Sequence, residues 1–173
     1  VNRVIVDRTL YPAFAELVVE RVSKLKVGNP NDADTVIGPV VNQSQLNGLL
    51  RKIDQAHSAG LTKLFGASAN GLLLPPHVFG NVKADDALAV DETFGPLLPM
   101  LIADDEAHAL RLANASEYGL SSAVFTQDMA RGLQFARGIV AGMTHINDIT
   151  VDDQPNAPFG GEKNSGLGRF NGH

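Results

Sequence analysis

Two stretches of the sequence combine residue types that could do chemistry. The first is Glu92-Thr93-Phe94-Gly95-Pro96, which places a carboxylate two residues before an aromatic ring. Each carboxylate oxygen can accept a hydrogen bond from a hydroxyl, so Glu92 suits a ribose, as acidic residues do in dinucleotide sites. Phe94 offers a flat apolar face for a ring. The alternative is a plain loop in which Gly95-Pro96 forms the turn before the apolar run at Leu97.

The second stretch, residues 158–169, reads Pro-Phe-Gly-Gly-Glu-Lys-Asn-Ser-Gly-Leu-Gly-Arg. Its four glycines imply a backbone that turns sharply or approaches another group closely. A structural loop without a ligand explains them equally well. A dinucleotide-binding loop does not, because Gly166-Leu167-Gly168 opens no helix within a strand–helix–strand unit.

Composition argues against several functional classes. The 173 residues carry a net charge of −5 with no basic block, so nucleic acid and anionic membrane are poor partners. No apolar run approaches the ~20 residues that span a bilayer. The sequence contains no cysteine, which rules out a thiol nucleophile within it and fits a reducing, cytoplasmic compartment. Its five histidines share no metal-ligand spacing, so we expect no metal site.

The pattern of apolar residues predicts an α/β fold. A β-branched run at residues 4–6 predicts a strand, and Thr9 is expected to cap the helix that follows. Asn42, with Gln45 three residues later, predicts the start of a second helix through a capping box. Pro75-Pro76 places the extended run around it at an edge of the sheet or outside it.

Strands and helices alternate more regularly after residue 97. Strands are expected at residues 97–102, 121–125 and 143–146, and helices open at Asp104-Asp105-Glu106 and at Asp128. Strands separated by helices of about ten residues favour parallel pairing. We therefore predict a single domain over residues 1–173, with a layered, mostly parallel sheet flanked by helices.

Taken together, these stretches resemble the aldehyde dehydrogenase superfamily. Residues 92–96 resemble its E-x-F-G-P motif, and residues 158–169 contain every fixed position of its P-F-G-G-x-K-x-S-G-x-G-R motif. Residues 118–126 are similar to its Y-G-L-(S/A)-(A/S)-x-V-(F/W)-(T/S) segment. The resemblance covers essentially the whole chain and implies that it is part of the family's catalytic domain.

The resemblance implies roles for residues in both stretches. Glu92 would bind the nicotinamide-side ribose of NAD or NADP, and Phe94 would pack against the nicotinamide or its ribose. Asn147 would order a strand end beside the active site, and the glycine-rich run would be structural. The pocket for a small-molecule aldehyde would be lined in part by Phe159, Ile149, Thr150 and Val151.

The resemblance also implies chemistry that this sequence does not contain. In the family a thiolate attacks the aldehyde, hydride passes to NAD(P)+, and an activated water hydrolyses the thioester. The cysteine, the general base and an oxyanion-stabilising asparagine would lie before Val1, and an oligomer-forming strand would follow His173. We therefore expect the chain to be part of a longer homo-oligomeric enzyme, to hold no catalytic residue and to be inactive alone.

Within the family, residues 147–155 are most similar to the corresponding loop of enzymes for aromatic aldehydes, such as benzaldehyde, vanillin and salicylaldehyde dehydrogenases. The β-branched pair Ile149-Thr150 would suit a flat ring. Two alternatives stay open. One is a non-catalytic relative that keeps the fold as a structural or binding protein, and the other is a member that acts on an acyl-CoA or a semialdehyde.

Overall fold

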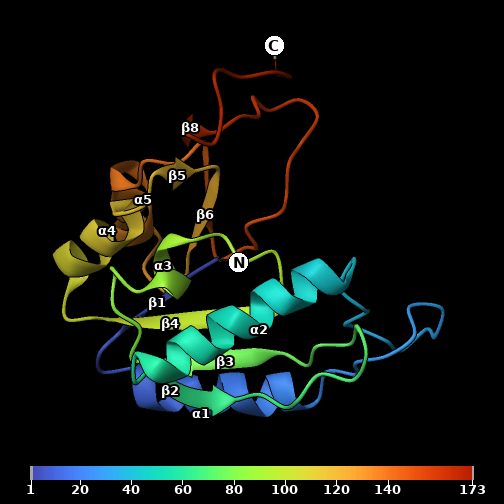
Figure 1. Ribbon diagram of the computed structural model, residues 1–173. Helices are drawn as coiled ribbons and strands as arrows, with labels where there is room; N and C mark the ends of the chain where they lie inside the picture. The colour runs from blue at the N-terminus through green and yellow to red at the C-terminus, as the bar shows by residue number, and fades with distance from the viewer. Residues whose placement is uncertain (1, 173) are drawn as a thin grey trace. The chain divides into compact units, whose positions relative to one another are not determined.

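The computed structural model of the protein describes residues 2–172 and divides into two compact units, residues 1–104 and 105–173 (Figure 1). Each unit has its own strands and helices and is described by itself below. The assignment of residues 1–173 to a single domain stays a prediction.

A four-stranded sheet forms the centre of the first unit. Its strands lie in the order β1 (Val4–Asp7), β4 (Leu97–Ala103), β3 (His77–Gly80) and β2 (Thr62–Phe65). Strand β4 pairs in parallel with both β1 and β3, whereas β2 pairs antiparallel with β3. The predicted layered, mostly parallel sheet is therefore confirmed in this unit.

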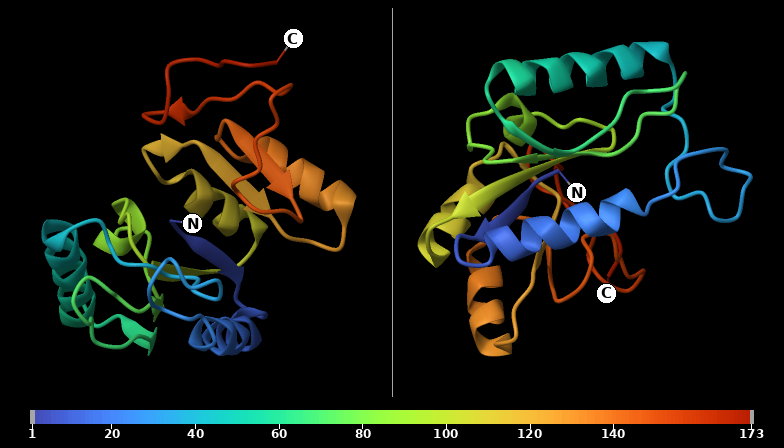
Figure 2. Two further views of the ribbon diagram at one scale, coloured as in Figure 1. Left: turned by 90° about the vertical axis from the view of Figure 1, so that its right-hand side faces the viewer. Right: turned by 90° about the horizontal axis from the view of Figure 1, so that it is seen from below.

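Helices cover both faces of this sheet. Helix α1 (Tyr11–Ser23) lies on one face, and α2 (Gln43–Ser58) lies on the other with the short helix α3 (Ala87–Val90) (Figure 2). The start of α2 is the predicted one, since the Asn42 side chain accepts a hydrogen bond of 2.9 Å from the backbone N–H of Gln45.

The sheet buries side chains toward both layers of helices. Successive residues of a strand point to opposite faces, so β3 can serve both layers. Val78 of β3 packs with Met100 of β4 and Ala15 of α1 in one core cluster. Phe79, the next residue, instead meets the ring of His57 from α2 at a centroid distance of 5.8 Å.

Two expectations about the first unit are wrong. Thr9 does not cap α1, which has Leu10 at its N-cap without a side-chain hydrogen bond. The reason is that Thr9 is already engaged, because its backbone N–H donates to a carboxylate oxygen of Asp7 at 2.8 Å and its hydroxyl bonds the same oxygen. Pro75-Pro76 does not confine the following run to an edge either. Strand β3 begins at His77, after both prolines, so the hydrogen-bond ladder of this internal strand keeps its N–H donors.

The second unit combines two helices with two small sheets. The helices are α4 (Glu106–Asn114) and α5 (Met129–Gly138). The sheets are the parallel pair β6 (Ser121–Val124) and β7 (Met143–Ile146), and the antiparallel pair β5 (Tyr118–Gly119) and β8 (Glu162–Lys163). The predicted helix starts are confirmed, because Asp105 and Asp128 accept hydrogen bonds from backbone N–H groups of the first turns of α4 and α5.

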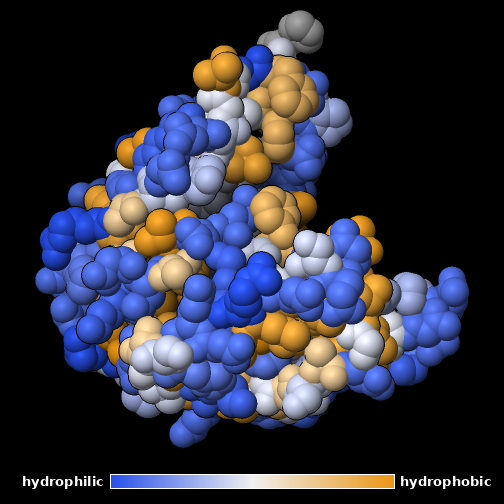
Figure 3. All heavy atoms as spheres, viewed as in Figure 1, coloured by the Kyte–Doolittle hydropathy of each residue, from blue (hydrophilic) through white to orange (hydrophobic). Residues whose placement is uncertain are grey.

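On the face drawn in Figure 3, apolar side chains lie among hydrophilic ones. Among residues 2–172, the helices are all too short or too polar for a transmembrane span.

His77 is the polar residue buried at the start of β3, where it is 5% exposed. Its Nδ1 lies 2.8 Å from the carbonyl oxygen of Pro75, and its ring stacks on Phe79 with centroids 6.3 Å apart. Burial lowers the pKa of His77 below its ordinary value of 6.5, and this effect outweighs the opposing effect of the backbone hydrogen bond. Positive charge on Lys63 and on His57 lowers that pKa further.

This burial predicts a pH dependence of stability. Because the pKa of His77 is lower in the folded than in the unfolded protein, the unfolded state binds more protons once the pH falls below about 6.5. We expect the free energy of unfolding to fall with pH there, and His77→Gln to flatten that fall. Urea titrations between about pH 5 and pH 8 would measure it. The control His108→Gln keeps His77, so its free energy of unfolding should fall with pH as in the unmodified protein. If His77→Gln showed the same fall as the unmodified protein, His77 would not be its cause.

Candidate functional site

The segment of residues 91–96 lies between α3 and β4 in the first unit. Glu92 is exposed, and Phe94 is 73% exposed although it is a large apolar residue. Phe94 also has φ of 45°, in the left-handed region that a bulky side chain rarely adopts. Such a backbone conformation costs about 1–3 kcal/mol and persists only where the surroundings fix it. The backbone of Phe94 is therefore kept in an unfavourable conformation, while its ring is exposed to solvent.

One face of α2 fixes this segment. Gln45, Leu49 and Lys52 recur at helical spacing, so they lie on the same side of α2. Gln45 donates a side-chain hydrogen bond to the carbonyl oxygen of Phe94, and Lys52 binds the Asp91 carboxylate at 2.7 Å.

Between these two contacts, the Leu49 side chain lies directly against Gly95. A Cβ at that position would be 2.5 Å from both Leu49 methyl carbons, so a side chain there would displace the end of Leu49. The same face of α2 thus contacts the segment at its beginning, its middle and its end. The local constraint on Phe94 comes from α2.

The Glu92 carboxylate is available to a ligand. Within residues 2–172 it takes part in no hydrogen bond or ion pair, in contrast to Asp91 one residue earlier. An exposed carboxylate can accept hydrogen bonds from two hydroxyls, and an exposed aromatic ring two residues later can pack on a flat apolar group. In the structure, both residues predicted to bind the cofactor are exposed.

The glycine-rich stretch of residues 158–169 lies in the second unit, where its polar residues bind backbone groups. Lys163 donates from Nζ to the carbonyl oxygens of Asn114 and Ser116, at 2.9 and 2.8 Å, and so caps the C-terminal end of α4. The hydroxyl of Ser165 accepts a hydrogen bond of 2.9 Å from the backbone N–H of Gly119. These contacts give Lys163 and Ser165 structural roles.

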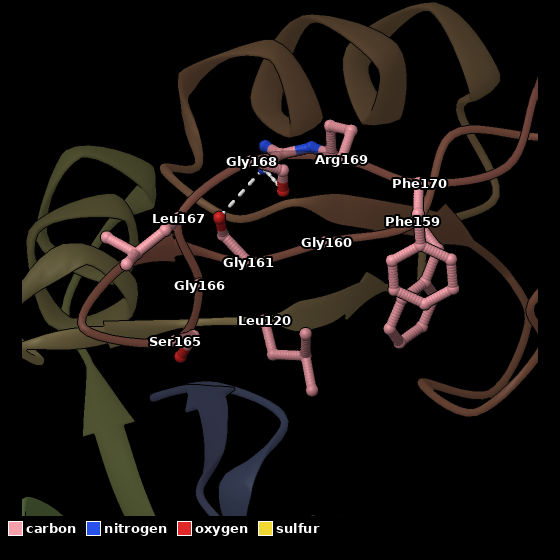
Figure 4. Close-up of a pocket in the computed structure, with 10 residues that line it drawn as sticks. All are labelled: Leu120, Phe159, Gly160, Gly161, Ser165, Gly166, Leu167, Gly168, Arg169 and Phe170. Atoms are coloured by element: carbon pink, nitrogen blue, oxygen red, sulfur yellow. Dashed lines mark hydrogen bonds between the residues drawn. The ribbon is translucent and has the colours of Figure 1, made fainter.

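A pocket of about 340 Å³ lies along the same stretch (Figure 4). Phe159 lines it together with Phe170, and their rings are 5.1 Å apart. Arg169 also lines it, but its guanidinium donates to the carbonyl oxygens of Gly161 and Gly168, at 2.8 and 3.0 Å. Arg169 therefore holds the loop in this fold.

Asn147 joins the ends of strands β6 and β7. Its side chain forms two hydrogen bonds with the backbone of Thr126, accepting from the N–H at 2.8 Å and donating to the carbonyl at 2.9 Å. Its own N–H donates to the carbonyl of Val124, and its φ is 58°, which asparagine tolerates better than most residues. The strand-ordering role expected of Asn147 is the one that these bonds show.

The segment after Asn147 contains the three other residues predicted to line the aldehyde pocket. Ile149 and Val151 are 62% and 77% exposed, and Thr150 between them is half-buried. Of these pocket predictions, only Phe159 is among the described residues that line the pocket of Figure 4. The other three residues, Ile149, Thr150 and Val151, do not line that pocket, and only Ile149 and Val151 are exposed.

Sequence reasoning missed two supporting residues. Gln45 was expected only to help cap α2, although its side chain also binds the segment that contains Phe94. Ser121 was recognised only as part of a motif, although its hydroxyl donates to the carbonyl oxygen of Thr150 at 2.7 Å. Both contacts join positions far apart in the sequence, where periodicity carries no signal.

No cluster of possible metal ligands occurs among residues 2–172.

Comparison with known proteins adds independent information. The whole chain, residues 1–173, matches the family model described as "Aldehyde dehydrogenase family". The chain is 52% identical over 172 residues to the vanillin dehydrogenase of Corynebacterium glutamicum. That match covers 99% of the chain and 36% of the relative, so the chain spans about a third of the relative's length.

Solved structures give the same result. A NAD-dependent benzaldehyde dehydrogenase from Corynebacterium glutamicum matches with a TM-score of 0.84 and 48% identity, over 87% of this chain and 33% of that one. A salicylaldehyde dehydrogenase from Pseudomonas putida G7, complexed with salicylaldehyde, matches with a TM-score of 0.93 and 37% identity, over 98% of this chain and 35% of that one.

Close backbone packing beside the glycine-rich stretch leads to a prediction. A Cβ added to Gly142 would overlap the backbone carbonyl of Gly160. We expect Gly142→Ala to lower the free energy of unfolding by about 1–3 kcal/mol, because a backbone has to move. Gly48→Ala in α2 is the control; its nearest neighbour would be 3.8 Å away, and helix propensity should raise stability by roughly 0.5–1 kcal/mol. Urea unfolding would measure both; equal effects would contradict the packing.

Proposed function

We propose a function from one premise: the chain belongs to the aldehyde dehydrogenase family. In the full-length protein it forms part of an enzyme that oxidises an aldehyde to the carboxylic acid through a thioester, with NAD or NADP as the oxidant. The observation that most supports this proposal is the 52% identity to a vanillin dehydrogenase over nearly the whole chain. The relatives named for vanillin, benzaldehyde and salicylaldehyde favour an aromatic aldehyde as substrate.

In this proposal, Glu92 and Phe94 bind the cofactor. The unpaired, exposed carboxylate of Glu92 accepts hydrogen bonds from the ribose next to the nicotinamide. The Phe94 ring, on a backbone that Gln45 helps to hold in a left-handed conformation, packs on the nicotinamide or its ribose. When bound, NAD(P)+ supplies the hydride acceptor. The exposed and constrained geometry of the two residues fits such a ligand.

Four residues contribute to the aldehyde pocket in the same proposal. Ile149 and Val151 present exposed apolar side chains, and Phe159 presents a ring at the edge of the glycine-rich stretch. Thr150 lies between the first two and has its carbonyl held by Ser121. Apolar walls of this kind suit an uncharged aromatic ring, which gains its binding energy from the apolar area removed from water. These residues are Phe159, Ile149, Thr150 and Val151.

A cytoplasmic location and a homo-oligomeric state stay predictions of the family resemblance.

The experiment that tests the proposed activity is NADH formation by the full-length protein. We expect turnover with NAD+ and benzaldehyde, and slower turnover with acetaldehyde or succinate semialdehyde. The 173-residue chain alone should give none, because it contains no cysteine. Turnover by that chain, or none by the full-length protein with any aldehyde, would contradict the proposal.

The role of Glu92 can be tested by a single substitution in the full-length protein. Glu92→Gln keeps the size of the side chain and replaces a charged acceptor by a neutral amide. Hydrogen bonds to charged groups contribute about 1.5–3 kcal/mol, so cofactor affinity or the rate of hydride transfer should fall roughly 10- to 100-fold.

Steady-state kinetics with varied NAD+ and direct titration of NAD+ would measure the effect. The matched control is Glu16→Gln, which changes an exposed glutamate on α1 and should leave both unchanged. Kinetics of Glu92→Gln indistinguishable from those of the unmodified protein would remove Glu92 from the site.

A further inference from the structure

The segment of residues 148–157 has little structure of its own. It follows β7, contains no helix or strand, and exposes both Ile149 and Val151. Its internal hydrogen bonds are short-range. They join the Ile149 N–H to the Asp148 carboxylate, Gln154 to Asp152, and the Ala157 N–H to the Gln154 carbonyl. Bonds of this kind shape local turns, but they do not tie the segment to the rest of the second unit.

One hydrogen bond does tie it. Ser121, the first residue of β6, donates from Oγ to the carbonyl oxygen of Thr150 at 2.7 Å, across 29 positions of the sequence. Within residues 2–172, this is the hydrogen bond that connects residues 148–157 to a strand or helix. Both partners are partly buried, so water competes for this bond less than it would at an exposed site.

The neighbouring serine shows that the contact is specific to one side of β6. Successive side chains of a strand point in opposite directions, so Ser121 and Ser122 face different surroundings. Ser122 bonds within the β6–β7 pair, with its Oγ 2.8 Å from the hydroxyl of Thr144 and 3.3 Å from the carbonyl of Met143. Of these two adjacent serines, Ser121 therefore binds the segment of residues 148–157, whereas Ser122 binds only β7.

We propose that Ser121 is a positioning residue for the aldehyde pocket, and that it sets the preference for aromatic over short aliphatic aldehydes. The carbonyl that Ser121 holds lies in the middle of Ile149-Thr150-Val151. Fixing this carbonyl fixes the backbone between two exposed apolar side chains and hence the direction of both. This inference rests on the proposed function, in which these side chains form a wall of the pocket.

A fixed wall matters most to a rigid, flat substrate. An aromatic ring gains contact area along its whole face only when both apolar side chains keep their places, whereas a two-carbon aldehyde barely reaches them. Without the Ser121 bond, the wall has to be ordered when the substrate binds, and that ordering reduces affinity. The reacting groups are not touched, so the change belongs in KM and not in kcat.

The kinetic test uses the full-length protein carrying Ser121→Ala, with Ser122→Ala as the matched control. We expect Ser121→Ala to raise KM for benzaldehyde roughly three- to tenfold, the effect of losing one hydrogen bond, with kcat and the KM for NAD+ unchanged. KM for acetaldehyde should stay the same. Ser121→Thr, which keeps the hydroxyl, should restore benzaldehyde binding. Equal rises in KM for both aldehydes, or none for either, would overturn the specificity role.

A second measurement tests the positioning itself without relying on activity. Hydrogen–deuterium exchange followed by mass spectrometry should show faster exchange in peptides covering residues 148–153 of Ser121→Ala, and unchanged exchange there in Ser122→Ala. Unchanged exchange in Ser121→Ala would overturn the proposal. If the unmodified protein oxidised no aldehyde, the proposed function would fail, and the exchange result would still decide whether Ser121 orders the segment.

Discussion

Hydrogen bonds from side chains to backbone carbonyls fix residues 91–96 and 148–157, the two segments that contain most of the candidate ligand contacts, and also cap the end of α4. Gln45 binds the carbonyl of Phe94, Ser121 binds that of Thr150, and Lys163 binds those at the end of α4. A carbonyl outside the helices and strands has no place in their regular hydrogen-bond ladders, so a side-chain donor on a regular element can bind it instead. Each such side chain holds the backbone at one carbonyl group. The exposed residues beside that point, Phe94 in one unit and Ile149 in the other, are thereby presented in a defined direction.

The two units contribute different parts of the proposed function. In the first, contacts with α2 stabilise the unfavourable left-handed backbone of Phe94. Strained backbone conformations of this kind cluster at ligand-binding sites. In the second, the glycine-rich motif is used for folding: its lysine, serine and arginine bind backbone groups of the same unit. A motif that identifies a family is thus not always the part that touches the ligand. Apart from Phe159, the candidate ligand contacts, Glu92 and Ile149 among them, lie outside the glycine-rich motif.

Much of the fold follows from local rules in the sequence. The caps at Asn42, Asp105 and Asp128 and the parallel strands were predictable, because caps and alternation act over a few residues. Thr9 failed as a cap because Asp7 competes for it two residues away, which propensity alone cannot rank. The central position of β3 was missed because two prolines suggested an edge, while the strand begins just after them. The roles of Gln45 and Ser121 lay beyond prediction, since each depends on a partner 49 or 29 positions away.

In the proposed function, this chain serves the oxidation of an aromatic aldehyde by NAD(P)+ in the full-length protein. The most direct measurement uses benzaldehyde deuterated at the formyl carbon and analyses cofactor and product by mass spectrometry. We expect benzoate as the product and one deuterium on each molecule of reduced cofactor. Reduced cofactor without deuterium, or deuterated benzaldehyde recovered unchanged with no reduced cofactor, would contradict it.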